Sequence, residues 1–147
     1  ALAVPGIAGT SPFDETRDGN DACSAGATAQ ACALTMKGQQ VFKFGVTTIC
    51  DAVNGLCAQA GIEVSAIDHF IFHQANERIL AAARARLGLD DTKVARTLAH
   101  TGNISSACIP YTIDTLARNG ELKQGELIAL VGFGAGLDTG SCLMRWS

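Results

Sequence analysis

The sequence has few charged residues, few aromatic residues and few prolines. Charged residues make up 17% and aromatic residues 5% of the 147 residues, and there are 3 prolines. Together with 48% hydrophobic residues, this low charge excludes a disordered tail. The net charge of −3 argues against a nucleic-acid partner. No run approaches the roughly 18 apolar residues of a membrane span, so we also expect no membrane partner.

The sequence also lacks the spacings of metal and redox sites. Its six cysteines include no C-x-x-C pair, and its three histidines have no ligand spacing with them. We therefore expect no metal site. A chain of this size can build a hydrophobic core without disulfides, so we expect mostly reduced, buried cysteines and a cytoplasmic protein.

Two regions differ in their patterning. Residues 1–35 are rich in small and polar residues and predict a loop-rich N-terminal segment. Residues 36–147 carry the periodic patterns of a folded domain. The first of these predicts an amphipathic helix that begins at Val41 and ends at Gly61. Its expected inner face is formed by Phe42, Val46, Ile49, Val53 and Leu56.

The rest of the sequence alternates between strand and helix patterns. Strands are predicted at 67–72, 93–98, 126–133 and 141–146, and helices at 77–87 and 105–118. Helices between strands imply parallel crossovers, and the short last connection implies a hairpin. The fold class is therefore α/β, a mixed and mostly parallel sheet with helices on both faces and an antiparallel C-terminal strand.

Three loops at strand ends carry candidate functional residues. They contain His73, Asn103 and the glycine-rich turn from Phe133 to Gly136. Neutral N–H donors in a dry site suit the stabilisation of an oxyanion. Each feature also has a structural explanation, because the histidine can be structural, Asn103 can cap a turn or helix, and the glycines can simply connect two strands.

In combination, these motifs resemble a known family. The run 73–79 (HQANERI), then Gly102-Asn103-x-Ser105, then Gly132-Phe133-Gly134-x-Gly136 is similar to the C-terminal half of β-ketoacyl-acyl carrier protein synthase III. These condensing enzymes belong to the thiolase-like superfamily. The resemblance covers about residues 31–147 and implies that residues 36–147 are a thiolase-like half-domain.

The resemblance implies a decarboxylative Claisen condensation of an acyl thioester with malonyl-acyl carrier protein in fatty acid biosynthesis. His73 and Asn103 match the family residues that hold the malonyl thioester carbonyl while carbon dioxide leaves. The resulting carbanion then attacks an acyl group carried by a cysteine. Phe133, Gly134, Ala135 and Gly136 match the turn in which a backbone amide helps to hold the acyl-enzyme oxyanion.

The resemblance also implies the partners. Arg78 matches a residue that docks acyl carrier protein, and Arg84 and Arg86 on the same predicted helix would add to that surface or simply be solvated. Coenzyme A and phosphopantetheine thioesters are implied as substrates, without a cofactor or metal. Family members are homodimers.

Some positions depart from the family pattern. Ile104, Ser106 and Cys108 stand where the family usually has Thr, Ala and Ser, and Ala135 replaces the middle glycine of the turn. The nucleophilic cysteine of the family lies in an N-terminal half that this chain lacks. We therefore expect a fragment or one piece of a split enzyme, inactive by itself.

Two alternatives remain open on the sequence. The chain can be a non-catalytic, ketosynthase-like subunit that binds acyl carrier protein. It can also be a thiol hydrolase that uses Cys23 and His73. The sequence around Cys23 superficially resembles the family's nucleophile motif, but no predicted strand precedes it, as a nucleophile at a helix N-terminus would require.

Overall fold

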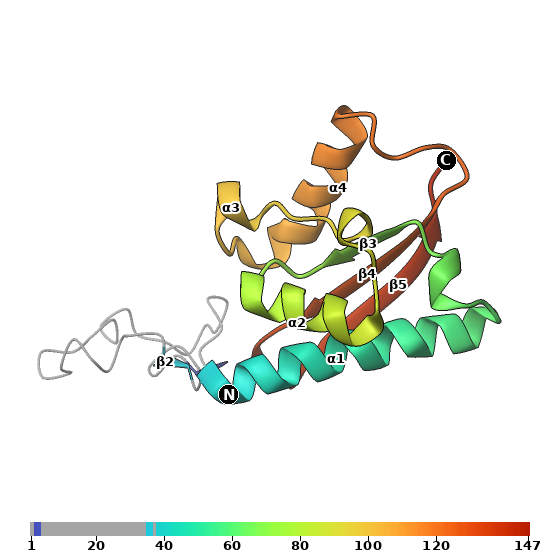
Figure 1. Cartoon of the computed structure of the whole chain (residues 1–147). Helices are drawn as coiled ribbons and strands as arrows, with labels where there is room; N and C mark the ends of the chain where they lie inside the picture. Colours follow the sequence, from blue (N-terminus) through green and yellow to red (C-terminus); the bar gives the residue numbers. More distant parts are fainter. Residues whose placement is uncertain (1, 4–34, 37) are drawn as a thin grey trace, which may run out of the picture. The chain divides into compact units, whose positions relative to one another are not determined.

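The computed structural model describes residues 2–3, 35–36 and 38–147 (Figure 1). The chain divides into two units, residues 1–41 and residues 42–147. In the first unit, β1 (Leu2–Ala3) pairs antiparallel with β2 (Thr35–Met36). Most of the predicted loop-rich segment, including Cys23, lies outside the described residues.

The second unit contains a three-stranded sheet in the order β3-β4-β5. Strand β3 (His69–Phe72) is parallel to β4 (Leu127–Phe133), and β4 is antiparallel to β5 (Thr139–Arg145). The mixed sheet and its antiparallel C-terminal strand are as predicted, although β3 starts two residues later than expected. The parallel pairing places the C-terminal ends of β3 and β4 at the same edge of the sheet.

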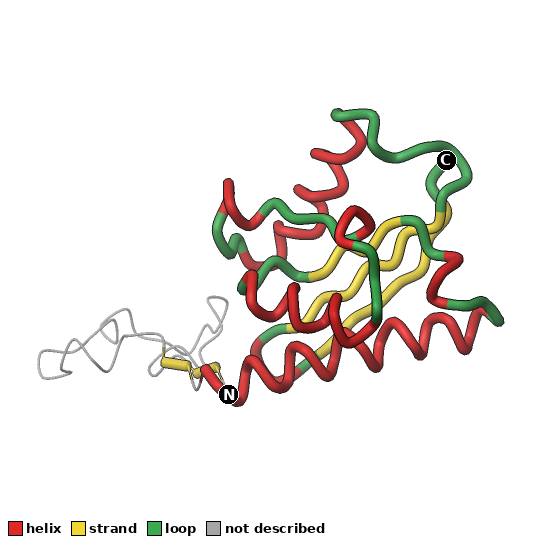
Figure 2. The backbone as a smooth tube through the Cα atoms, viewed as in Figure 1, coloured by secondary structure: helices red, strands yellow, loops and turns green. Residues whose placement is uncertain are grey.

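Helices cover both faces of this sheet. Helices α1 (Gly38–Ala60) and α2 (Glu77–Leu87) lie on one face and α4 (Cys108–Arg118) lies on the other (Figures 1 and 2). Successive residues of a strand point to opposite faces. Accordingly, Phe70 and Phe72 are buried with residues of α1 and α2, whereas Ile71 is buried with Leu116 of α4.

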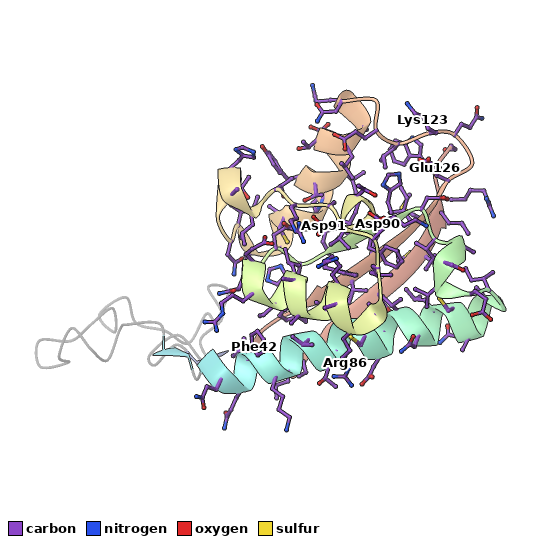
Figure 3. All side chains as sticks on the ribbon, viewed as in Figure 1. Phe42, Arg86, Asp90, Asp91, Lys123 and Glu126 are labelled. Atoms are coloured by element: carbon purple, nitrogen blue, oxygen red, sulfur yellow. The ribbon has the colours of Figure 1, made fainter. Side chains whose placement is uncertain are left out.

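Helix α1 confirms most of the predicted inner face and corrects one residue. Val46, Ile49 and Val53 are buried against the sheet, and Leu56 is partly buried beside them. Phe42, however, is 39% exposed on the first part of the helix (Figure 3). The helix begins at Gly38, before the predicted start, so its first turns precede the part that packs on the core.

Helix α1 also corrects the expectation that no segment is long enough to span a membrane. An 18-residue window within it has a mean hydropathy of 1.2, and one third of that window is buried inside the structure. By length and composition the helix could cross a bilayer. A core helix of a soluble protein meets the same criteria, so this property by itself assigns no membrane role.

Helix α2 has the predicted bounds because local signals define both of its ends. The Asn76 side chain accepts a hydrogen bond of 2.8 Å from the backbone N–H of Arg78, which caps the first turn. Gly88 ends the helix with φ of 65°, a left-handed conformation that favours glycine. The short connection from β3 to this cap, residues 73–76, contains His73 and Gln74, which are described in the next subsection.

The strand predicted at 93–98 is wrong. This segment is a 3₁₀ turn, η3 (Asp91–Lys93), followed by one parallel bridge between Val94 and Phe70 and then the short helix α3 (Leu98–Thr101). Strand pairing ends there because the buried side chain of Gln74 binds the next backbone amides, as described below. The predicted helix 105–118 begins as a 3₁₀ turn, η4 (Ser105–Ala107), and continues as α4.

Four cysteines lie in the described part of the chain, and all four are free thiols. Cys50, Cys57 and Cys108 are buried as predicted. Cys142 is exposed, because it lies on β5 at the edge of the sheet. Cys142 therefore lies within the strand predicted at 141–146 but outside the core.

Candidate functional site

His73 follows the last residue of β3 and is fixed at the C-terminal edge of the sheet. Its backbone N–H donates to the carbonyl of Val131 in β4 over 2.8 Å, which extends the parallel pairing by one residue. The side chain is half-buried. The position of His73 is therefore set by the pairing of β3 with β4 rather than by a free loop.

The imidazole of His73 lies between a thiol and an aromatic ring. Its Nδ1 atom is 2.9 Å from Sγ of Cys108, the first residue of α4. The ring of Phe133, at the end of β4, meets the imidazole edge to face with 5.1 Å between centroids and 86° between planes. Burial lowers the pKa of His73 below its ordinary value, so the neutral imidazole is favoured.

Gln74 is completely buried, and its side chain makes four hydrogen bonds to the backbone. Its Nε2 atom donates to the carbonyls of Phe72 (2.9 Å) and Ala95 (3.3 Å). Its Oε1 atom accepts from the amides of Thr97 (3.0 Å) and Leu98 (3.2 Å). The amide group therefore ties the end of β3 to the start of α3.

Two buried threonines complete a ring of contacts that returns to His73. The hydroxyl of Thr112 donates to the carbonyl of Cys108 over 2.8 Å, and its oxygen lies 2.8 Å from the hydroxyl of Thr97. Sequence reasoning assigned no role to Gln74, Thr97 or Thr112. The available signal was a glutamine two positions after a strand that is buried on both faces.

Asn103 lies in an exposed turn between α3 and η4. Its Oδ1 atom accepts a hydrogen bond of 3.0 Å from the backbone N–H of Ser105. Gly102 (φ 64°) and Ser105 (φ 57°) both have positive φ values, so the turn is tightly defined. The turn role considered for Asn103 is therefore present and orients the carboxamide, whereas neither η4 nor α4 has a side-chain cap.

The structure links the His73 and Asn103 loops through the backbone rather than by a side-chain contact between them. Cys108, which touches His73, lies five positions after Asn103 and at the end of the same connection. A cavity of about 250 Å³ is lined by residues that include His69, Thr97 and His100, but not by His73 or Asn103. The described residues thus bring His73 and Phe133 into contact and leave Asn103 facing outward.

The glycine-rich turn connects β4 to β5, as predicted. The N–H of Gly134 donates to the carbonyl of Asp138 over 3.0 Å and closes the turn. Gly136 has φ of 85°, and a Cβ atom there would lie 3.1 Å from Oδ2 of Asp138. Glycine at 136 is therefore favoured by the backbone conformation, and a side chain there would also displace the carboxylate of Asp138.

The three arginines of α2 have different environments. Arg78 and Arg86 are exposed, and Arg86 lies on the part of α2 beside α1 (Figure 3). Arg84 is half-buried, with its Nε atom 3.2 Å from Oδ1 of Asp91 and its Nη1 atom donating to the carbonyl of Leu89 over 3.3 Å. Arg84 is therefore engaged within the chain, while the other two guanidinium groups face solvent.

The thiol beside His73 is Cys108. Cys23, the partner in the thiol-hydrolase hypothesis, lies outside the described residues. Cys108 is only 1% exposed, so an external substrate could not reach its sulfur. No cluster of three His, Cys, Asp or Glu side chains suited to a metal ion occurs among residues 38–147.

Residues 57–146, which include β3 through β5 and the whole ring of contacts around His73, match a family profile. The profile is described as 3-oxoacyl-[acyl-carrier-protein (ACP)] synthase III C terminal. The chain belongs to this family. The expected thiolase-like fold, a C-terminal half of such a synthase, is confirmed.

A named relative agrees with the family match. The chain is 40% identical over 114 residues to beta-ketoacyl-[acyl-carrier-protein] synthase III of Synechocystis sp., which covers 78% of this chain and 34% of the relative. The chain thus spans about a third of that relative's length.

Solved structures show the same relationship. The structure of 3-oxoacyl-(acyl carrier protein) synthase III from Pseudomonas aeruginosa PAO1 superposes with a TM-score of 0.76 and 38% identity, over 82% of this chain and 38% of that one. The synthase III of Thermus thermophilus superposes with a TM-score of 0.77 and 32% identity, over 100% of this chain and 45% of that one.

Proposed function

We propose that this chain supplies the malonyl-binding and decarboxylating part of a β-ketoacyl-acyl carrier protein synthase III in fatty acid biosynthesis. The observation that carries the proposal is the placement of His73 in a chain of this family. Its imidazole is held at the end of β3, in contact with Cys108 and Phe133, and burial keeps it neutral.

The proposed chemistry needs neutral donors. When the malonyl group loses carbon dioxide, the electron pair of the broken C–C bond moves into an enolate, and negative charge develops on the thioester oxygen. A preformed N–H donor stabilises that charge without reorganising at the moment of reaction. The neutral imidazole of His73 offers one such donor.

Asn103 is proposed to give the second donor. Because its Oδ1 atom accepts from the N–H of Ser105, its Nδ2 group is left to point away from the turn. We propose that this amide and the imidazole of His73 bind one thioester oxygen together when the rest of the enzyme encloses them. The exposure of Asn103 in this chain is consistent with a pocket wall that another polypeptide supplies.

The glycine-rich turn is proposed to bind the oxyanion of the acyl-enzyme. The N–H of Gly134 is already used by the carbonyl of Asp138, so we assign the donor to the amides of Ala135 or Gly136. Replacement of a glycine by Ala135 keeps a backbone N–H. The side chain of Phe133 anchors the start of this turn against His73.

The nucleophilic cysteine is proposed to lie on an N-terminal half outside this chain. Strand β5 forms the edge of the sheet among the described residues, and its first four residues, Thr139 to Cys142, are exposed. An open strand edge with exposed side chains is suited to pairing with further polypeptide. The complete enzyme is proposed to be a cytoplasmic homodimer, and this chain alone to be inactive.

Acyl carrier protein is the proposed partner, and coenzyme A and phosphopantetheine thioesters are the proposed substrates. We propose that acyl carrier protein binds to exposed positive charge on α2, which Arg78 and Arg86 provide. Arg84 is proposed to contribute less, since it is paired with Asp91 (labelled in Figure 3).

The test is reconstitution with the N-terminal half of the Pseudomonas aeruginosa relative, followed by assays of malonyl decarboxylation and of condensation. His73→Ala and Asn103→Ala should each lower the decarboxylation rate by about 10²- to 10³-fold, the usual loss for one oxyanion donor. His100→Ala and Asn119→Ala, at exposed positions around the separate cavity, should retain the rate. Full activity without His73 or Asn103 would refute the assigned roles. Specific binding of acyl carrier protein without either reaction would favour the non-catalytic alternative.

A further inference from the structure

The thiol of Cys108 is placed to determine which nitrogen of His73 carries the proton. Its sulfur lies 2.9 Å from Nδ1 of His73 and 3.4 Å from the backbone nitrogen of Gln74. Cys108 is 1% exposed, so its sulfur has no access to bulk water. Sequence comparison singled out this position only as a departure from the family, which usually has Ser there.

Counting protons identifies the arrangement in which every group at this contact is satisfied. The backbone N–H of Gln74 can only donate, so the sulfur accepts there. A thiol has one proton of its own, and a neutral imidazole has one ring nitrogen that accepts. If the thiol proton is directed to Nδ1, the sulfur donates once and accepts once, and every group at this contact is satisfied.

We propose that Cys108 is a positioning residue that donates its thiol proton to Nδ1 of His73 and thereby holds the imidazole proton on Nε2. The proposal deepens the function proposed above, because the Nε2–H group is then the donor that meets the thioester oxygen. In a histidine, the hydrogen bond made by one ring nitrogen sets the protonation of the other.

The surrounding contacts hold Cys108 in place for this role. The hydroxyl of Thr112 donates to the carbonyl of Cys108, and Thr112 is itself bonded to Thr97. Gln74 fixes the amide of Thr97 and donates its own backbone N–H to the sulfur. The start of α4 is thereby tied to the end of β3, and a thiol that turned away from the imidazole would lose the hydrogen bond from the N–H of Gln74.

The experiment is ¹⁵N NMR of the histidine rings in the whole chain at neutral pH, which distinguishes a protonated from an unprotonated ring nitrogen. There are three histidines, so His69→Gln and His100→Gln assign the His73 signals. We expect the wild-type proton on Nε2. Cys108→Ala should shift the ratio of Nε2–H to Nδ1–H about 5- to 10-fold toward Nδ1–H, the worth of one hydrogen bond. Cys108→Ser should restore the wild-type state, because a hydroxyl also donates.

Matched variants separate this role from general packing. Cys57→Ala removes another buried thiol, on α1, and should leave the His73 signals unchanged. If Cys108→Ala folds poorly, Cys108→Val restores volume without a donor and should show the same shift. A proton on Nδ1 in the wild type, an imidazolium beside a thiolate, or unchanged His73 signals in a folded Cys108→Ala or Cys108→Val chain would overturn the proposal.

This measurement needs no substrate and no second half of the enzyme. An inactive reconstituted enzyme whose His73 is protonated on Nε2 would refute the proposed function and leave the role of Cys108 intact. An active enzyme in which Cys108→Ala leaves the His73 tautomer unchanged would refute the role of Cys108 and leave the proposed function intact.

Discussion

Thr97 and Thr112, fifteen positions apart, are both buried and share a hydrogen bond of 2.8 Å between their hydroxyl oxygens. Because Thr112 donates its own proton to the carbonyl of Cys108, Thr97 must be the donor in this pair. The bond joins the residue before α3 to the second turn of α4. It closes the ring of contacts that begins at Gln74 and ends at His73.

Thr112→Val is expected to lower the free energy of unfolding by about 1–3 kcal/mol, because it leaves the Thr97 hydroxyl buried without an acceptor. Urea denaturation measures the change. Thr97→Val with Thr112→Val removes both partners and keeps the shape, so the double variant should lose less than the sum of the single variants. Additive losses would show that the two hydroxyls are not coupled.

Two glycines of α1 should respond oppositely to alanine. A Cβ atom at Gly45 would lie 3.0 Å from Cζ of Phe133 and 3.2 Å from Cγ2 of Ile79, so Gly45→Ala should destabilise the fold by about 1–3 kcal/mol. A Cβ atom added at Gly55 would meet no atom within 4 Å outside its own stretch of helix, so Gly55→Ala should stabilise the fold by about 0.5–1 kcal/mol. Thermal unfolding compares the two, and a stabilising Gly45→Ala would contradict the packing of Phe133 on α1.

Gln74→Leu is expected to cost at least about 3 kcal/mol, since two buried and two part-buried backbone hydrogen bonds are lost. Hydrogen exchange at the amides of Thr97 and Leu98 should quicken more than exchange in α2. Gln124→Leu, at an exposed position, should change stability by less than about 0.5 kcal/mol. Equal effects of the two variants would show that Gln74 does not anchor α3.

The stability of the chain should depend on pH through His73. Burial lowers its pKa below the ordinary 6.5, so the unfolded chain binds a proton at a pH at which the folded chain does not. The free energy of unfolding should therefore fall as the pH drops below about 6.5 and level off below the folded pKa. Urea denaturation of the wild type and of His73→Gln at several pH values measures this, and the variant should lack this part of the slope.

The two carboxyl groups with lowered pKa values, Asp90 and Asp91, titrate outside that window. A hydrogen bond from the Thr92 side chain lowers the pKa of Asp90, and one from Arg96 lowers the pKa of Asp91. Their contributions to the free energy of unfolding are present above the ordinary carboxyl pKa and are lost as the pH falls through the lowered pKa values of the folded chain. Identical pH slopes for the wild type and His73→Gln would contradict a neutral, buried imidazole.

Reversing a charge on α2 tests whether acyl carrier protein docks on this helix. Arg78→Glu in the reconstituted enzyme is expected to weaken binding of acyl carrier protein about 5- to 10-fold, with the larger effect at low salt. Arg118→Glu makes the same change on α4, which lies on the opposite face of the sheet, and should leave the affinity unchanged. Calorimetric titration measures both. Equal losses would indicate a response to net charge rather than a docking surface on α2.

The sequence by itself determined the elements whose signals are local. Helix α2 was predicted with its observed bounds because Asn76 and Gly88 act on backbone groups within one turn of themselves. The buried strands were predicted from apolar runs, and the position of His73 after β3 followed from them. The motifs around His73 and Asn103 also identified the family, since their order and spacing are properties of the chain.

Only the tertiary structure decided the contacts between distant residues. The segment 93–98 has a strand-like pattern, but Gln74, more than twenty positions away, binds the amides of Thr97 and Leu98 and turns the chain into α3. Phe42 has the periodicity of a core residue, but no local signal shows that its turn precedes the packed part of α1. The pairing of His73 with Cys108 has the same origin. Hydrogen-bond partners separated by 20 to 60 positions are chosen by how the helices pack on the sheet, and that packing is not written in any short stretch of sequence.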